Sequence, residues 1–280
     1  MDACGEDPQS IQELDEVLCE WYHDLYVTRG GGCRGYAESA LSGIHLMLPQ
    51  VKGHLHQSKL ALKGWRKRVP AVPHPPLTWD LTVCIGVRLA CKGQWVTAVG
   101  ALLAFDCYLR VGELVRLTLS DVADVGDCRM GSGFRGMALR LSKTKTGSNQ
   151  WVTVRNPDVV FLVRQRLGSM RSRRRNARLF PFAAGTFRKH FKAGCADLEL
   201  SKDYVPHSLR HGGATHDHLR GMTVEDIARH GRWASTKSAR HYIQSGRAML
   251  LTTSVPGSVS ELFDTLVPNV LDAFSLAQTH

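Results

Sequence analysis

Four prolines fall within nine residues at Val69–Leu77 (VPAVPHPPL), and this segment limits the possible folds more than any other. Proline holds φ near about −65° and lacks a backbone N–H, so a helix cannot run through such a stretch. Proline-rich segments favour extended, semi-rigid connections. We therefore expect the chain to divide here into an amino-terminal domain over residues 1–72 and a larger part that follows it.

The amino-terminal part carries apolar patterns of helical spacing. Apolar residues recur every three or four positions from Ile11 to Trp21, and again from Tyr36 to Leu48. This period places them on one face of a helix. Gly30–Gly32 separates the two runs, as glycine repeats interrupt helices. A third run, Lys59–Arg68, mixes apolar and basic residues. These patterns predict a small helical domain.

Beyond the prolines, residues 81–109 are mostly apolar and end in ALLAFDCYL, which predicts buried helices. Residues 137–141 then alternate between large apolar and other residues, and Trp151–Val154 follows the polar stretch Thr146–Asn149. Two such runs around a short polar tip predict a β-hairpin. From Asn156 the patterns are helical again. The expected fold is mainly α with a small antiparallel β-sheet, an α+β protein.

Three helix starts can be read from capping residues. Asn156 is followed by Pro157, a pair typical of a helix N-cap and first turn. Thr223 stands three residues before Asp226, which indicates another start by capping-box logic. Ser235 is a third candidate N-cap, for the segment that bears Tyr242.

The charge of the chain is high and uneven. The formal net charge is +11 and the isoelectric point is near 9.5. All charges in Arg164–Arg178 are positive, whereas Pro256–His280 has acidic residues and no Lys or Arg. Arginines of this kind supply salt-sensitive affinity for phosphates. A solvated surface loop and a nuclear-localisation tract are the alternatives for Arg171–Arg175.

These charges give two groups of candidate DNA-binding residues. The first group is Arg171, Arg173, Arg174 and Arg175. The second group lies in the KGWRKR stretch and includes Arg66 and Lys67. Its third member is the lysine that opens this stretch, which we place at position 64.

The eight cysteines are scattered and form no CxxC pair. With no secretory signal in view, this pattern favours a reducing intracellular compartment, the nucleus in a eukaryotic host. No apolar run approaches the roughly 20 residues that span a bilayer, so we expect no membrane association.

Three segments carry the candidate chemical residues. They are YLRVGEL at 108–114, SKTKTG at 142–147, and the stretch from HSLRHGGAT to GRWASTKSARHYI at 207–243. Each motif alone is weak, because a single Arg, Lys, Trp or Tyr is more often a packing or surface residue. The four histidines at 207, 211, 216 and 218 also suggest a metal, but the cysteines lack ligand spacing and no HExxH motif occurs. No metal or cofactor is expected.

In order and spacing, these motifs resemble the catalytic domain of the tyrosine recombinases, the phage-integrase family. Arg110 matches the family's first arginine, within its LR-x-G-E-L stretch, and Glu113 matches the acidic residue three positions later. Lys145 matches the lysine of the family's β-hairpin, and Lys143 is near enough to compete. The resemblance covers roughly residues 77–247.

The third segment completes the resemblance. His207 and Arg210 match the family's H-x-x-R pair, and His211 follows Arg210. Trp233 lies nine residues before Tyr242, where the family has His or Trp before its nucleophilic tyrosine. The resemblance implies a catalytic set of Arg110, Lys145, His207, Arg210, Trp233 and Tyr242, with Glu113 and His211 in supporting positions.

The implied reaction is DNA cleavage and rejoining through a 3′-phosphotyrosine, without metal or ATP. Fixed cations must meet the charge that gathers on the non-bridging phosphate oxygens, and Arg110 and Arg210 can each offer a planar fork of donors. Tyr242 would attack, with His207 taking its proton. Lys145 would protonate the departing 5′-oxygen, and Trp233 could donate its indole N–H to a phosphate oxygen.

The resemblance also implies domains and partners. Residues 1–72 would be a DNA clamp, shortened relative to the family, and residues 73–255 the catalytic domain. Residues 256–280 carry one apolar helical face, which would pack on its own domain or be exchanged between protomers. The expected partners are double-stranded DNA and further copies of the chain, as a dimer on one site and a tetramer in synapsis, with no small-molecule substrate. The KGWRKR stretch and the prolines resemble recombinases of DIRS- or Crypton-like mobile elements, which implies DNA integration or transposition.

Two other interpretations stay open. A domesticated recombinase could bind DNA without cutting it, and the short clamp favours that version. A helical scaffold whose Arg tract serves only localisation would show no DNA affinity even at low salt.

Overall fold

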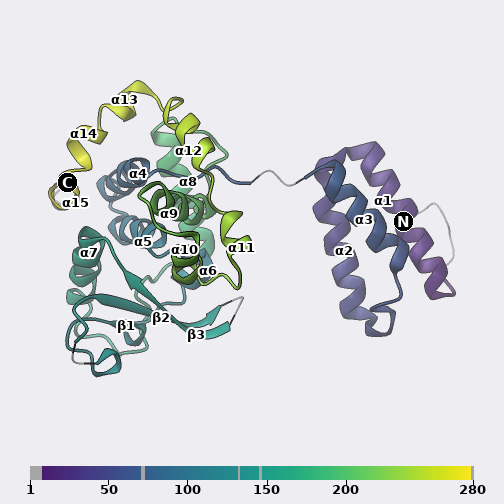
Figure 1. Cartoon of the computed structure of the whole chain (residues 1–280), viewed down its shortest axis with the longest axis horizontal. Coiled ribbons are helices and arrows are strands. Elements are labelled where there is room, and N and C mark those ends of the chain that lie inside the picture. The colour runs from purple at the N-terminus through teal and green to yellow at the C-terminus, as the bar shows by residue number, and fades with distance from the viewer. Residues whose placement is uncertain (1–7, 71–72, 132, 145–146, 279–280) are drawn as a thin grey trace. The chain divides into compact units, whose positions relative to one another are not determined.

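The computed structural model describes residues 8–70, 73–131, 133–144 and 147–278, and it divides into two compact units. Unit 1 comprises residues 1–73 and unit 2 comprises residues 74–280 (Figure 1). The division falls within the proline-rich segment. Each unit has a hydrophobic core of its own.

Unit 1 is a bundle of α1 (Ile11–Arg29), α2 (Arg34–Met47) and α3 (His56–Arg68). Short 3-10 turns at Gly31–Cys33 and Pro49–Val51 connect the helices. The Asp15 carboxylate on α1 accepts hydrogen bonds from the backbone N–H groups of Gln57 and Ser58, and so caps α3 in place of a local residue. The helical prediction for this part is therefore right. Its core consists of Leu18, Tyr22, Leu25, Ala37, Leu41, Val51, Leu55, Leu62 and Trp65.

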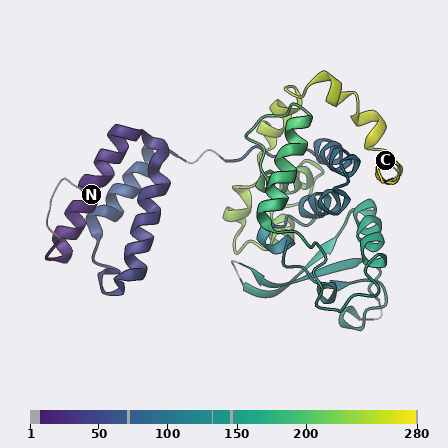
Figure 2. The ribbon, with the colours of Figure 1, turned by 180° about the vertical axis from the view of Figure 1, so that it is seen from behind.

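Unit 2 is built around two apolar helices, α4 (Trp79–Cys91) and α5 (Trp95–Asp106), which pack on each other. Both are buried along most of their length, as the run of apolar residues indicates. Around them pack α7 (Pro157–Gly168), α8 (Ala184–Asp197) and α9 (Pro206–Leu219). Figure 2 shows α8 and the α4–α5 pair from the other side.

Short helices complete the part of unit 2 that precedes the tail. They are α6 (Val111–Leu114), α10 (Val224–Gly231) and α11 (Thr236–Arg240), with 3-10 turns at Leu119–Asp121 and Cys128–Met130. The three predicted N-caps are confirmed, since the side chains of Asn156, Thr223 and Ser235 each accept a backbone N–H of the following first turn.

The sheet has three antiparallel strands in the order β1 (Val122–Ala123), β2 (Met137–Thr144), β3 (Gly147–Val154). Leu139 of β2 pairs with Val152 of β3, and both side chains are buried in the core of unit 2. The predicted hairpin and the fold class are therefore confirmed. Lys145 lies outside the described residues, and of Lys143 only the backbone, paired with Ser148, is described.

The carboxyl-terminal segment differs from the prediction. Instead of one amphipathic helix over 256–280, it forms α13 (Gly257–Ser260), α14 (Phe263–Leu266) and α15 (Val270–Leu276), after α12 (Ser245–Thr252). Pro268 has no N–H to continue α14, so a new helix begins beyond it. Val270 and Phe274 of α15 are buried, and the Phe274 ring lies against Gly86 of α4. The tail thus packs on its own unit.

Among the described residues, no helix is both long and apolar enough to cross a membrane.

Candidate active site

Tyr108, just after α5, sets the backbone from which the site is built. Its φ is +48°, a left-handed conformation that costs a non-glycine residue about 1–2 kcal/mol. The turned carbonyl of Tyr108 accepts hydrogen bonds from the guanidinium groups of both Arg210 and Arg232. Its hydroxyl donates to Asp217 on α9, so the side chain is held as well. The strain therefore serves to present one carbonyl to two arginines.

Helix α9 approaches this turn closely because of its glycine pair. A Cβ on Gly212 would lie 2.2 Å from the Leu77 carbonyl oxygen, and one on Gly213 would lie 2.1 Å from the Phe105 carbonyl oxygen. Only glycine allows backbone to pack on backbone at this distance. The HSLRHGG motif thereby brings Arg210, one turn earlier on α9, beside Tyr108.

Arg210 is completely buried. Its two terminal nitrogens donate to the carbonyls of Tyr108 and Gly231, the latter at 2.8 Å. Its Nε has no hydrogen-bond partner among the described residues. Burial and the nearby guanidiniums of Arg110 and Arg232 lower its pKa to about 9, so it is still protonated at neutral pH. Arg210 is a fixed cation with donor capacity left over.

Arg110 is the N-cap residue of α6 and is held by Glu113. Its backbone N–H donates to Glu113 Oε2 at 3.0 Å, and its Nη1 donates to Glu113 Oε1 at 2.7 Å. Burial raises the pKa of the Glu113 carboxyl, but Arg232 and the two hydrogen bonds from Arg110 outweigh it and leave that pKa below its usual value. Glu113 is therefore an anion between two arginines.

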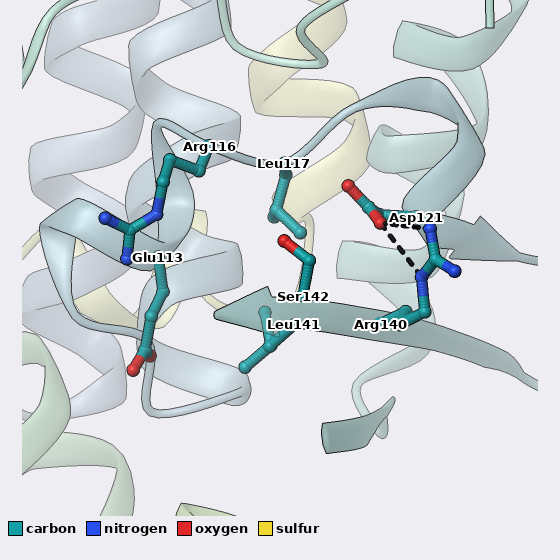
Figure 3. A pocket seen from close by; sticks show the side chains of 7 residues that line it. All are labelled: Glu113, Arg116, Leu117, Asp121, Arg140, Leu141 and Ser142. Atoms are coloured by element: carbon teal, nitrogen blue, oxygen red, sulfur yellow. Dashed lines mark hydrogen bonds and ion pairs between the residues drawn. The ribbon is translucent and has the colours of Figure 1, made fainter. Parts of the chain in front are cut away.

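Glu113 also marks the end of a small pocket between α6 and β2. Figure 3 shows its carboxylate at one end, the ion pair of Asp121 and Arg140 at the other, and Leu117 and Leu141 between. This arrangement separates the two acidic groups and leaves Glu113 to the arginines of the site.

Tyr242 lies two residues beyond the end of α11 and is half-buried. Its backbone carbonyl accepts a hydrogen bond from Thr215 Oγ1 on α9 at 3.2 Å. Its ring centroid lies 4.7 Å from that of Trp233 and 4.6 Å from that of His211, on which it stacks at 29°. The guanidinium carbon of Arg210 is 5.3 Å from the same ring centroid.

Two histidines flank the tyrosine. The His207 ring centroid is 5.5 Å from that of Tyr242. Burial and the Arg210 charge lower the pKa of His207 to about 4. Burial and His207 lower the pKa of His211 to about 3. The Gln244 side-chain amide donates to His211 Nδ1 at 2.8 Å, which leaves the proton on Nε2. Both imidazoles are neutral at pH 7.

Trp233 closes the site over Arg210. The Arg210 guanidinium carbon is 4.4 Å from the ring centroid of Trp233, a cation–π contact. A Cβ on Gly231 would come within 1.8 Å of this ring, so the glycine makes room for it. The indole N–H is buried and has no hydrogen-bond partner among the described residues.

The first group of basic candidates lies in the segment between α7 and α8. Its side chains are exposed, and the Arg175 carbonyl accepts a hydrogen bond from the Ser120 N–H. The members of the group are Arg171, Arg173, Arg174 and Arg175. Their role in binding DNA stays a prediction, as do the reaction roles of the site residues.

The second group lies on α3 in unit 1, and it requires one correction. A lysine at position 64 is wrong by one residue: that position is Gly64, and the lysine that opens the KGWRKR stretch is Lys63. Gly64 has no side chain with which to contact a phosphate, whereas Lys63 is exposed. Arg66 and Lys67 are also on α3, and Arg66 pairs with Glu38 at 2.9 Å. The basic candidates of α3 are therefore Lys63, Arg66 and Lys67, and their binding to DNA also stays a prediction.

The sequence patterns did not single out Arg232. It ends α10 in a left-handed conformation and is buried beside Glu113 and Tyr108. A lone arginine just past a helix end is typical of an exposed cap, so nothing local distinguishes it. Only the folded arrangement shows that it belongs to the site.

Solved integrase structures share the fold of this chain. No curated protein matches the sequence. Among solved structures, a lambda integrase dimer bound to a COC′ core site matches with a TM-score of 0.56 and 15% sequence identity. The match covers 84% of this chain and 65% of the lambda integrase chain, which is less than two thirds of its length. The Tn1549 transposon integrase in complex with transposon right end DNA matches with a TM-score of 0.54 and 14% identity, over 91% of this chain and 89% of that one.

Identities this low show a common fold. The sequence itself carries the family assignment, since the model of the Phage integrase family matches residues 89–248, more than half of the chain. That span includes Arg110, Arg210 and Tyr242, and the protein belongs to the phage integrase family.

Proposed function

We propose that this protein is a site-specific tyrosine recombinase that cleaves and rejoins DNA through a covalent bond between Tyr242 and a 3′-phosphate. The observation that carries the proposal is the convergence of one phenol, one fixed cation and one neutral imidazole. The Tyr242 ring centroid lies 5.3 Å from the guanidinium carbon of Arg210 and 5.5 Å from the ring centroid of His207. Family membership and the shared fold support the same reaction class.

The arginines supply what the transition state requires. Negative charge gathers on the non-bridging oxygens of the phosphate, and preorganised donors stabilise it most when they need not move. Arg210 uses two of its five N–H groups on carbonyls and keeps the rest, including Nε, for the phosphate. Arg110 at the start of α6 lies near enough for its charge to lower the pKa of both Arg210 and His207, and Trp233 offers its unpaired indole N–H.

Proton transfer falls to His207 and a hairpin lysine. The phenol of a tyrosine has a pKa of about 10, so Tyr242 must lose its proton as it attacks. The His207 imidazole is neutral at pH 7, and a neutral imidazole can accept that proton. We assign protonation of the departing 5′-oxygen to Lys145, with Lys143 as the competing donor.

DNA binding must also rearrange the site. Arg210 is completely buried, and its guanidinium lies beside the rings of Trp233 and Tyr242. A phosphate can therefore reach Arg210 only if side chains that cover it, such as Tyr242, move. The segment between α11 and α12 carries this tyrosine, so we expect that segment to move when DNA binds.

The experiment is a suicide-substrate assay with Tyr242→Phe. The variant lacks the nucleophilic oxygen, so it should form no covalent protein–DNA adduct and should bind DNA with the wild-type Kd. Tyr36→Phe is the matched control, because it removes the hydroxyl of an exposed tyrosine in unit 1 and should leave adduct formation intact. Adducts with the Tyr242→Phe variant would refute the nucleophile assignment. A wild type that retains DNA but forms no adduct would instead favour a DNA-binding relic.

Other parts of the chain take supporting roles in this proposal. Residues 1–72 would clamp the duplex, and the basic residues of α3 and of Arg171–Arg175 would neutralise phosphates. The structural neighbours are DNA-bound integrases, the lambda protein as a dimer, so we propose a dimer on each site and a tetramer in synapsis. Exchange of the tail between protomers would require it to leave the surface of its own unit, where Phe274 packs against α4. All described cysteines are free thiols, which supports a reducing compartment, the nucleus in a eukaryote. An origin in a DIRS- or Crypton-like element stays a prediction.

A further inference from the structure

Arg232 combines two costly features in one residue. It follows α10 with φ +58° and ψ +39°, a left-handed conformation that glycine adopts more easily. Its side chain is only 3% exposed, so a guanidinium has been taken out of water. A charge is buried at such a position only where specific partners offset its desolvation.

Two of its four partners also hold the candidate catalytic arginines Arg110 and Arg210. One terminal nitrogen of Arg232 donates to the carbonyls of Cys107 and His230, at 3.1 and 2.9 Å. The other lies 3.3 Å from the Tyr108 carbonyl and 3.4 Å from Glu113 Oε2. The first pair fixes the guanidinium, and the second pair faces the site.

Each of these last two contacts leads to a different arginine. Glu113 is the carboxylate that binds Arg110 through its side chain and its backbone N–H. The Tyr108 carbonyl is the acceptor that Arg210 shares with Arg232. Arg232 therefore lies one hydrogen bond away from the partner of Arg110 and one away from the partner of Arg210.

We propose that Arg232 is a positioning residue, which holds Glu113 and the Tyr108 carbonyl and thereby sets the spacing of Arg110 and Arg210 around one phosphate. The inference rests on the proposed function and deepens it. Arg232 contacts no reacting atom; it acts through the two groups that orient the arginines. Its loss should lower the rate of the chemical step rather than the affinity for DNA.

The electrostatics of Glu113 agree with this role. Arg232 is the strongest cause that lowers the Glu113 pKa against the effect of burial, ahead of the hydrogen bonds from Arg110, and Arg210 contributes too. In the pocket of Figure 3, Arg116 lies at the same end as Glu113, and Asp121 and Arg140 form an ion pair at the other end. Without Arg232, burial should raise the Glu113 pKa, and Arg110 would lose its anionic partner as the pH falls.

A helix cap is the competing explanation, and substitution with glycine separates the two. Arg232→Gly keeps the left-handed backbone and even relieves its strain, but removes the guanidinium. If Arg232 only capped α10, glycine could replace it without loss of cleavage rate. If Arg232 positions the catalytic arginines, the same substitution should slow cleavage.

The test is single-turnover cleavage of a suicide DNA substrate by the full chain, with the Kd for the same DNA measured in parallel. We expect Arg232→Gly to lower the cleavage rate about 10²-fold, the scale of a misplaced catalytic group, with an unchanged Kd. Arg232→Lys keeps a charge near Glu113 but not the planar fork, so we expect a loss of about 10-fold. Arg220→Gly, at the C-cap of α9, removes another arginine after a helix and should cleave like the wild type.

The pH dependence gives a readout that a cap would not move. Because the Glu113 pKa should rise in Arg232→Gly, the ratio of its cleavage rates at pH 6 and pH 8 should fall below the wild-type ratio. Wild-type rates and an unshifted pH profile in Arg232→Gly would overturn the inference. If Arg232→Gly does not fold, Arg232→Lys decides by its cleavage rate and its Kd, and a wild-type cleavage rate in Arg232→Lys would overturn the inference. A wild type that forms no adduct would overturn the proposed function, and the inference with it.

Discussion

Arg210 and Arg110 lie in two regions of the site that hold a cation in different ways. Arg210 belongs to the floor, which we define as Tyr108, Arg210, Gly231 and Arg232. Its side chain is 0% exposed and is fixed by carbonyls. Arg110 belongs to the rim, which we define as Arg110 and the β2–β3 hairpin. Its side chain is 24% exposed and depends on one carboxylate.

The difference shows how stability and function are divided. The carbonyls that hold Arg210 belong to the backbone of Tyr108 and Gly231. Arg210 therefore cannot move unless the backbone moves as well. The rim cation can turn on its Glu113 contact and follow the phosphate. We therefore expect floor substitutions to damage folding and cleavage together, and rim substitutions to damage cleavage alone.

The difference between floor and rim is tested most directly by comparing the Arg210→Ala variant with the Arg110→Ala variant. Each removes a charged donor to the phosphate, so each should lower the cleavage rate by about 10²–10³-fold. Arg210→Ala should also lower the free energy of unfolding by about 1–3 kcal/mol, because the buried Gly231 carbonyl loses its arginine partner. Suicide-substrate kinetics and urea unfolding measure the two effects. Equal losses of stability in both variants would remove the distinction between floor and rim.

The next effect is expected where α9 packs on α5. Gly213→Ala would place a methyl group 2.1 Å from the Phe105 carbonyl oxygen, and a backbone atom cannot yield as a side chain can. We expect the free energy of unfolding to fall by about 3 kcal/mol or more. Gly185→Ala on α8 is the control, because its Cβ would meet nothing within 4 Å. It should leave stability unchanged or raise it by about 0.5–1 kcal/mol. A stable Gly213→Ala variant would mean that the two helices are not in such close contact.

The smallest effect concerns pH. Burial lowers the pKa of His211 and of His230 to about 3, so both are neutral in the folded chain and charge on unfolding. A histidine whose pKa is lowered by folding contributes its full share to the free energy of unfolding above pH 6.5, its ordinary pKa. That contribution decreases as the pH falls below 6.5. Between pH 7.5 and 6.0 we expect a loss of roughly 1 kcal/mol for each buried histidine.

His230→Gln isolates one of these two contributions. His230 Nε2 lies 2.8 Å from the Asp106 carbonyl, and a glutamine amide can make the same hydrogen bond without titrating. The variant should take up about one proton fewer on unfolding at pH 5. An unchanged proton uptake would show that His230 is not buried in its neutral form.

Local signals explain why much of the fold could be predicted from the sequence. The caps at Asn156, Thr223 and Ser235 and the hairpin depend on neighbours a few residues away, so short patterns specify them. The division of the chain also follows from a local property, the run of prolines. The tail was predicted as one helix because its apolar period is regular, and Pro268 overrode that period.

The parts of the site that could not be predicted depend on contacts between distant segments. Nothing near Tyr108 in the sequence indicates a left-handed residue, because its strain is offset by arginines 102 and 124 positions away. No local signal marks Arg232 either, because its partners Tyr108 and Glu113 are also distant in sequence. The close approach at Gly212 and Gly213 involves Leu77 and Phe105, which no pattern within α9 can reveal. The resemblance to known motifs therefore predicts which residue types form the site, but the distances between them follow only from the folded structure.

The central claim is that Tyr242 is the residue that becomes bonded to DNA. The most direct measurement is mass spectrometry of the adduct trapped on a suicide substrate, after digestion of protein and DNA. The account predicts a nucleotide remnant on the peptide that contains Tyr242, attached at the phenol oxygen. A remnant on a different residue, with Tyr242 unmodified in the trapped adduct, would contradict it.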